Sequence, residues 1–127
     1  MKRFGILNHN GKEILFMAVG GSFASEAWMK SDEEYQRILG QSFSAITADD
    51  GKNWNIGRNI RRCTQEEYDR LFQSAHPAFK LKAELHSLKV KSLSAKLDSI
   101  WFLDNVDELL KDYSAEEIKE YYINKYC

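Results

Sequence analysis

The chain has 127 residues, of which 43% are hydrophobic and 29% are charged, and its formal net charge is −1. This balance is typical of a folded globular protein and excludes a disordered chain. It also excludes a generally basic nucleic-acid binder and a polyanionic mimic of nucleic acid. A chain of this length fits one domain, so we predict a single domain over residues 1–127, with subdomains 1–76 and 77–127 as the alternative.

The first predicted element is a hairpin near the N-terminus. Short apolar runs at residues 4–7 and 13–19 flank Asn10-Gly11. This dipeptide is the strongest short signal for a hairpin turn. We therefore predict two antiparallel strands here.

A helix and a second hairpin are predicted to follow. Ser31 and Glu34 have the spacing of a capping box, which opens a helix that ends at Gly40. Residues 43–47 and 54–56 then flank the turn sequence Asp-Asp-Gly-Lys. The N-terminal half is thus predicted to be a small antiparallel sheet of two hairpins with an inserted helix.

From Thr64 onward the pattern predicts helices. Capping boxes begin at Thr64 and at Ser114, and Pro77 ends the first of these helices. Leucines recur at helical spacing over residues 81–101, although the five-residue step after Leu88 indicates a bend or slip there. The fold class is therefore α+β, with a mostly α-helical C-terminal half.

Residues 78–92 admit a second interpretation. Phe79, Leu81 and Leu85 alternate with charged residues, as on a half-buried strand. However, Ala, Lys, Leu and Glu favour helix, and no turn residue interrupts the sequence from Lys80 to Lys96. We therefore predict a helix and keep the strand as the alternative.

Three arginines precede the helix predicted to begin at Thr64. Cations there oppose the partial positive charge of the free backbone N–H groups, so some anion must offset them. Arg58, Arg61 and Arg62 are predicted to form an anion or nucleic-acid site, because a guanidinium pairs with phosphate or carboxylate through two parallel bonds. The alternative is that acidic residues in the first helical turn neutralise them locally.

A basic helix face is the second candidate for nucleic-acid binding. Lys82, Lys89 and Lys96 recur every seven residues and would share one side of a helix. Such a face could follow a phosphate backbone, and its binding would weaken with salt. The alternative is a solvated face opposite the leucines.

Cys63 is the candidate for a reactive thiol. Two arginines precede it and the predicted N-cap follows it, and both conditions lower a thiol pKa. No histidine has a spacing that identifies a catalytic base, and a small buried hydrophobe is the alternative. We predict no catalytic residue, and no metal or cofactor, because the histidines and cysteines are scattered.

Tyr121, Tyr122 and Tyr126 crowd the last predicted helix beside three glutamates. Tyrosine is favoured at protein interfaces because it buries area and keeps a polar group. All three are candidate protein contacts. Tyr122 and Tyr126 share one helix face and Tyr121 is turned about 100° from Tyr122, so we expect one face inward and the other as the contact, with partial burial of both faces as the alternative. The leucine face over residues 81–101 would also permit a homodimer through the C-terminal helices.

The small size, the missing catalytic motif and the polar-aromatic surfaces resemble small inhibitors or accessory proteins of phages and other mobile elements. This is a similarity of type that no motif carries. It implies a non-catalytic interaction protein with a macromolecular partner, and we predict that the partner is a protein. Nucleic-acid binding is the first alternative, and anion or nucleotide binding by a small-molecule binder or an enzyme is the second.

The compartment is predicted from what the sequence lacks. No secretory signal is visible, and the longest apolar stretch, from Ile14 to Val19, is far shorter than the roughly 20 residues that span a bilayer. Cys63 and Cys127 form no motif. We therefore predict a cytoplasmic protein without membrane contact.

Overall fold

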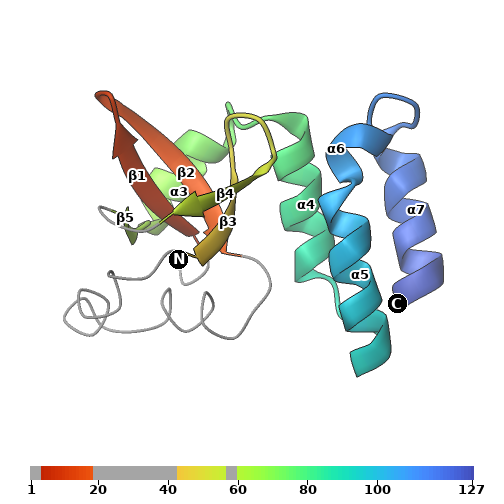
Figure 1. The fold of residues 1–127 in the computed structure, drawn as a ribbon. Coiled ribbons are helices and arrows are strands. Elements are labelled where there is room, and N and C mark those ends of the chain that lie inside the picture. The colour runs from red at the N-terminus through yellow and green to blue at the C-terminus, as the bar shows by residue number, and fades with distance from the viewer. Residues whose placement is uncertain (1–3, 19–42, 57–59) are drawn as a thin grey trace.

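The structure is a computed structural model that describes residues 4–18, 43–56 and 60–127. In this part of the chain, five strands form one antiparallel sheet in the order β4-β3-β2-β1-β5, and five helices follow them (Figure 1). The predicted α+β fold with a helical C-terminal half is confirmed. The helix predicted to open at Ser31 lies outside the described residues.

The first hairpin joins β1 (Phe4–His9) to β2 (Lys12–Ala18), as predicted. Asn10 and Gly11 adopt φ angles of 52° and 80°. A two-residue hairpin turn of type I′ needs positive φ at both central positions, and Asn and Gly tolerate this best. The local sequence therefore determines this turn.

The second predicted hairpin is also present and joins β3 (Phe43–Thr47) to β4 (Asn53–Ile56). β3 pairs with β2, so β2 lies at the centre of the sheet. Consecutive residues Leu15 and Phe16 point to opposite faces of β2, and both are buried. Both faces of the central strand are therefore covered.

The strand β5 (Ile60–Arg62) was not predicted. It pairs antiparallel with β1 at the edge of the sheet. The sequence predicted only the start of the next helix, at Thr64, in this region. A strand of three residues, two of them arginines, shows no alternation of apolar and polar residues that a sequence pattern could reveal.

The helices of the described chain are α3 (Gln65–Phe72), α4 (Pro77–Ser87), α5 (Leu93–Asp104), α6 (Val106–Leu109) and α7 (Ala115–Tyr126). The capping boxes predicted at Thr64 and Ser114 are both present. No helix in this part of the chain is long and apolar enough to cross a membrane.

The helix predicted for residues 78–92 is confirmed as far as Ser87 and wrong beyond it. Leu88 is extended, with φ −75° and ψ 143°, and Ser92 caps the next helix by accepting a hydrogen bond from the backbone N–H of Ala95. The leucine spacing over residues 81–101 therefore belongs to two helices. The five-residue step after Leu88 marks the break between them.

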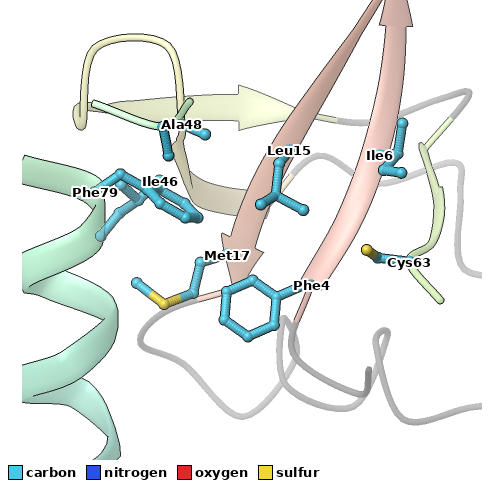
Figure 2. Close-up of a cluster of buried hydrophobic side chains, with 9 residues drawn as sticks. Phe4, Ile6, Leu15, Met17, Ile46, Ala48, Cys63 and Phe79 are labelled. Atoms are coloured by element: carbon cyan, nitrogen blue, oxygen red, sulfur yellow. The ribbon is translucent and has the colours of Figure 1, made fainter. Parts of the chain in front are cut away.

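Two clusters of buried apolar side chains share α4, which lies between the sheet and the helices α5, α6 and α7 (Figure 1). Phe79 points from α4 toward Ile46 and Ala48 of the sheet (Figure 2). Leu81 and Leu85 of the same helix join the cluster formed with α5, α6 and α7. Apolar packing therefore continues across residue 77, where the boundary between the alternative subdomains 1–76 and 77–127 would lie.

Candidate functional site

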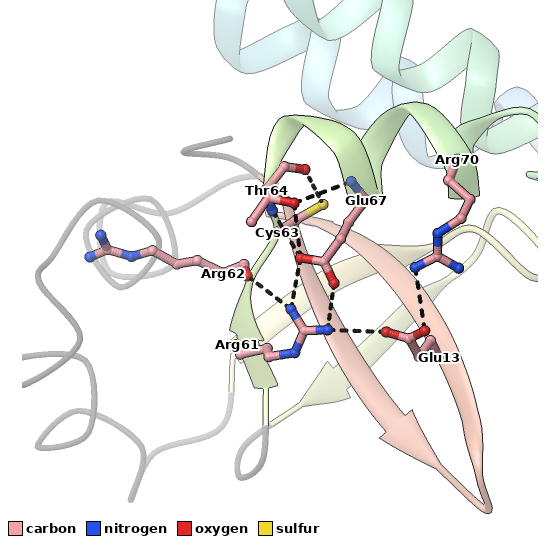
Figure 3. Close-up of polar contacts among 7 residues, drawn as sticks. All are labelled: Glu13, Arg61, Arg62, Cys63, Thr64, Glu67 and Arg70. Carbon is pink, nitrogen blue, oxygen red and sulfur yellow. Dashed lines mark hydrogen bonds and ion pairs between the residues drawn. The ribbon is translucent and has the colours of Figure 1, made fainter.

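The charge of Arg61 is neutralised within the chain. Its Nη1 and Nη2 atoms donate to the carboxylate of Glu67 at 2.9 and 2.5 Å, and Nη2 also donates to Glu13 at 3.0 Å (Figure 3). The hydrogen bond from Arg61 lowers the pKa of Glu67 to about 2. Local neutralisation, which was the alternative to an anion site, therefore holds for Arg61.

Arg62 does not complete an anion site around Arg61. The side chain of Arg62 extends away from Glu13 and Glu67 (Figure 3). Its Nε and Nη2 atoms are buried and find no hydrogen-bond partner in the described part of the chain. Arg58 lies outside the described residues. Arg61 and Arg62 thus point to different surroundings.

Replacing Glu67 by glutamine is expected to lower the free energy of unfolding at pH 7 by about 1 kcal/mol, after allowance for the solvent that screens the half-exposed Arg61. The pKa of Glu67 is lower in the folded state than in the unfolded state. Its stabilisation is therefore present above pH ~4.5 and disappears as the pH falls through about 2. Glutamine preserves the capping box, so the variant isolates the charge.

Urea unfolding of both proteins at several pH values measures this difference. Glu66→Gln, an exposed position on the same turn, is the control for a change of net charge. A difference between wild type and Glu67→Gln that stays constant from pH 7 to pH 2 would contradict the assignment.

The three lysines do not form one exposed face. The Lys82 side chain is only 1% exposed, and its Nζ donates to the Gly51 carbonyl at 2.7 Å and to Asp107 at 3.2 Å. Lys89 is exposed in the segment between α4 and α5, and Lys96 is half-buried on α5. The predicted basic face is wrong because the helix breaks between Lys82 and Lys96 and because Lys82 points inward.

Cys63 is a buried thiol, and the expected lowering of its pKa is wrong. Burial raises the pKa of Cys63 to about 11, and the carboxylate of Glu67 adds to the increase. The Sγ atom donates to the Thr64 carbonyl at 3.2 Å. Arg61 and Arg70 act in the opposite direction and lower the pKa of Cys63, but burial and the carboxylate of Glu67 outweigh them.

Thiol labelling is expected to separate the two cysteines. Cys127 is exposed and should react with an aromatic disulfide reagent at the rate of a free thiol, whereas Cys63 should react at least about 100-fold more slowly at pH 8. One equivalent is expected from the native protein and two from the unfolded protein. The variant Cys127→Ser provides the control, and rapid labelling of that native variant would refute the burial of Cys63.

The tyrosines of α7 divide between core and surface. Tyr122 and Tyr126 are buried in the helical cluster, so their prediction as protein contacts is wrong. Tyr121 is 51% exposed and stacks on Phe102 of α5, with ring centroids 5.4 Å apart. Among the three, only Tyr121 is placed to meet a partner.

The outer face of α5 is an exposed apolar surface. Leu93, Leu97 and Trp101 follow one another at intervals of one helical turn, and they are 77%, 56% and 74% exposed. Ala95, Ser99 and Leu103 on the opposite side of the helix are buried. The helical spacing of these residues is visible in the sequence, but spacing alone does not show which side of α5 packs inward. We call Leu93, Leu97 and Trp101 the α5 stripe.

A hollow of about 720 Å³ adjoins the α5 stripe. The residues that line it are Phe102, Asn105, Glu108, Leu109, Tyr113, Glu117, Ile118 and Tyr121. Asn105 connects the two features, because its Nδ2 donates to the Trp101 carbonyl at 3.0 Å. Among the described residues, the lining contains two carboxylates and no cationic side chain, so the hollow suits a cation better than an anion or a nucleotide phosphate.

Comparison with known proteins yields no significant match: the chain matches no protein-family model, no curated protein and no solved structure.

Proposed function

We propose that the protein is a non-catalytic interaction protein that binds a protein partner through the α5 stripe. The exposure of Leu93, Leu97 and Trp101 on one helix face is the observation that carries this proposal. Burying a large apolar side chain gains roughly 1.5–3 kcal/mol, so three of them in one row offer a substantial driving force for association. A contiguous exposed apolar surface is typical of an interaction site.

The partner that fits this surface is a basic amphipathic helix. Apolar side chains one turn apart match the ridges of a second helix. Asp98 and Asp104 are exposed on α5, and the chain from Asp104 to Cys127 holds seven acidic residues against three lysines. Lysine or arginine beside the apolar residues of the partner would complement these charges.

A second copy of the chain with its α5 helix parallel to the first fits less well, because that arrangement would bring Asp98 and Asp104 near the acids of their own kind. The nucleic-acid and anion alternatives lose support as well, since Arg61 is held in ion pairs and Lys82 is buried. The proposed role suits a small inhibitor or accessory protein in the cytoplasm, where thiols such as those of Cys63 and Cys127 stay reduced.

Affinity capture with matched variants tests the proposal. The triple variant Leu93→Ser/Leu97→Ser/Trp101→Ser should keep its stability, because these side chains are already in water, and should lose its partner by at least about tenfold. Ile123→Ser, which removes an exposed apolar residue from α7, should retain the partner.

Capture is made from lysate of the source cell, with nuclease added to half of each sample. A protein that survives nuclease and depends on the α5 stripe would support the proposal. Three outcomes would overturn the proposal. The triple variant could capture as much partner as the wild type, or every captured protein could be lost after nuclease. The pure chain could also form a dimer in sedimentation that depends on the α5 stripe.

A further inference from the structure

We infer that the hollow beside the α5 stripe is a binding site for an arginine side chain of the partner. The inference rests on the proposed function, since the arginine would belong to the same basic helix that covers the stripe. It adds a specific recognition site to what would otherwise be a purely apolar contact.

The carboxylate and amide oxygens of the hollow are hydrogen-bond acceptors. Glu117 uses its Oε1 atom to accept the backbone N–H of Ser114 in the capping box, which leaves Oε2 for a ligand. Asn105 uses its amide nitrogen on the Trp101 carbonyl, so its Oδ1 remains as an acceptor. Glu108 is held only by Lys111 at 3.0 Å, in a surface pair whose side chains are both mostly exposed. An arginine has five donors and no acceptor, which complements this set.

The walls of the hollow are aromatic and aliphatic. Phe102 and Tyr121 form a stacked pair on one side, and the exposed Tyr113 lies among the other lining residues with Leu109 and Ile118. Lys125 already lies over the Tyr121 ring, 5.5 Å from its centroid, so Tyr113 is the ring that an incoming cation would stack on. The aliphatic residues suit the methylene groups of a long cationic side chain.

Arginine fits these groups better than lysine does. A planar guanidinium has a face that can stack on an aromatic ring such as Tyr113 and a fork of donors that suits a carboxylate such as Glu117, whereas an ammonium is a compact and strongly hydrated charge. The position of Asn105 next to Trp101 places the hollow within reach of a helix that covers the stripe. The hollow is larger than one side chain, so it also leaves room for the residues that flank the arginine.

A nuclear magnetic resonance titration of the isolated protein with N-acetyl-arginine-N-methylamide tests the inference. Resonances of Tyr113, Asn105 and Glu117 are expected to shift and saturate at tens of millimolar, and the affinity should fall with added salt. The citrulline analogue, which has the same shape without the charge, is expected to bind at least about fivefold more weakly. Equal shifts with arginine and citrulline, or no shifts with either, would overturn the inference.

Variants locate the site. Glu108→Gln/Glu117→Gln should weaken arginine binding by about fivefold to tenfold, since two exposed charge contacts are lost while glutamine still caps α7. Glu120→Gln, on the same helix but outside the lining, should leave the affinity unchanged. Weakening by Glu120→Gln equal to that of the double variant would reject the hollow as the site.

The two proposals fail in distinguishable ways. The titration needs no partner, so the Leu93→Ser/Leu97→Ser/Trp101→Ser variant should still bind the arginine analogue. If the triple variant binds the analogue but captures its partner as well as the wild type does, the proposed function fails and the inference about the hollow as an arginine site stands. If capture depends on the stripe and the analogue does not bind, the inference about the hollow fails alone.

Discussion

Replacing Lys82 by methionine is expected to lower the free energy of unfolding by about 3 kcal/mol. The Lys82 ammonium joins the β3–β4 turn to α6 by its hydrogen bonds to Gly51 and Asp107. Methionine fills a similar volume but leaves a buried carbonyl without its donor and a largely buried carboxylate without its counter-ion. Chemical denaturation at neutral pH measures the loss.

Two further variants show whether the charge pair is the cause. Lys111→Met breaks the ion pair with Glu108 on the surface, where solvent screens both charges, and should leave the stability nearly unchanged. Lys82→Met/Asp107→Leu removes both charges and should recover much of the stability lost in Lys82→Met. Equal losses in Lys82→Met and Lys111→Met would show that burial of Lys82 contributes nothing to stability.

Replacing Gly51 by alanine is expected to destabilise the protein by about 2–4 kcal/mol. Gly51 has a φ of +75°, and an added Cβ would lie 2.6 Å from the Cβ of Ala78 and 3.1 Å from the backbone nitrogen of Phe79. Both contacts belong to the first turn of α4. The turn or the helix must therefore shift, which disturbs the packing of Phe79 against the sheet.

Gly11→Ala separates the steric contribution from the backbone contribution. Gly11 has a similar φ of +80°, but an added Cβ meets nothing within 4 Å, so only about 1 kcal/mol of backbone strain is expected.

Thermal unfolding of both variants also tests the domain organisation. One transition that moves as a whole in Gly51→Ala is expected for a single domain, and separate transitions of residues 1–76 and 77–127 would contradict it.

The parts of the fold that depend on local chemistry could be predicted from the sequence. The turn at Asn10-Gly11 needs only residues that tolerate positive φ, and the capping boxes at Thr64 and Ser114 need only residues three positions apart. The strand β5 could not be predicted, because its three residues pair with β1, more than fifty positions earlier in the chain.

The candidate site was predicted less well, because burial is set by distant partners. Lys82 points inward to meet Gly51 and Asp107, which are 31 and 25 residues away. The helix α5 is apolar on two opposite sides, and it packs through small residues, Ala95 and Ser99, which permit close approach. Its larger residues are thereby left outside, and periodicity alone cannot distinguish the two sides.

The most direct test of the α5 stripe as a protein-binding surface is a selection of displayed peptides on the wild-type protein. Selected peptides are then measured against Leu93→Ser/Leu97→Ser/Trp101→Ser and against the control Ile123→Ser. We expect sequences that are basic, with apolar residues at helical spacing, and that lose binding only on the triple variant. Acidic or uncharged sequences, or peptides that bind the triple variant as tightly as the wild type, would contradict the account.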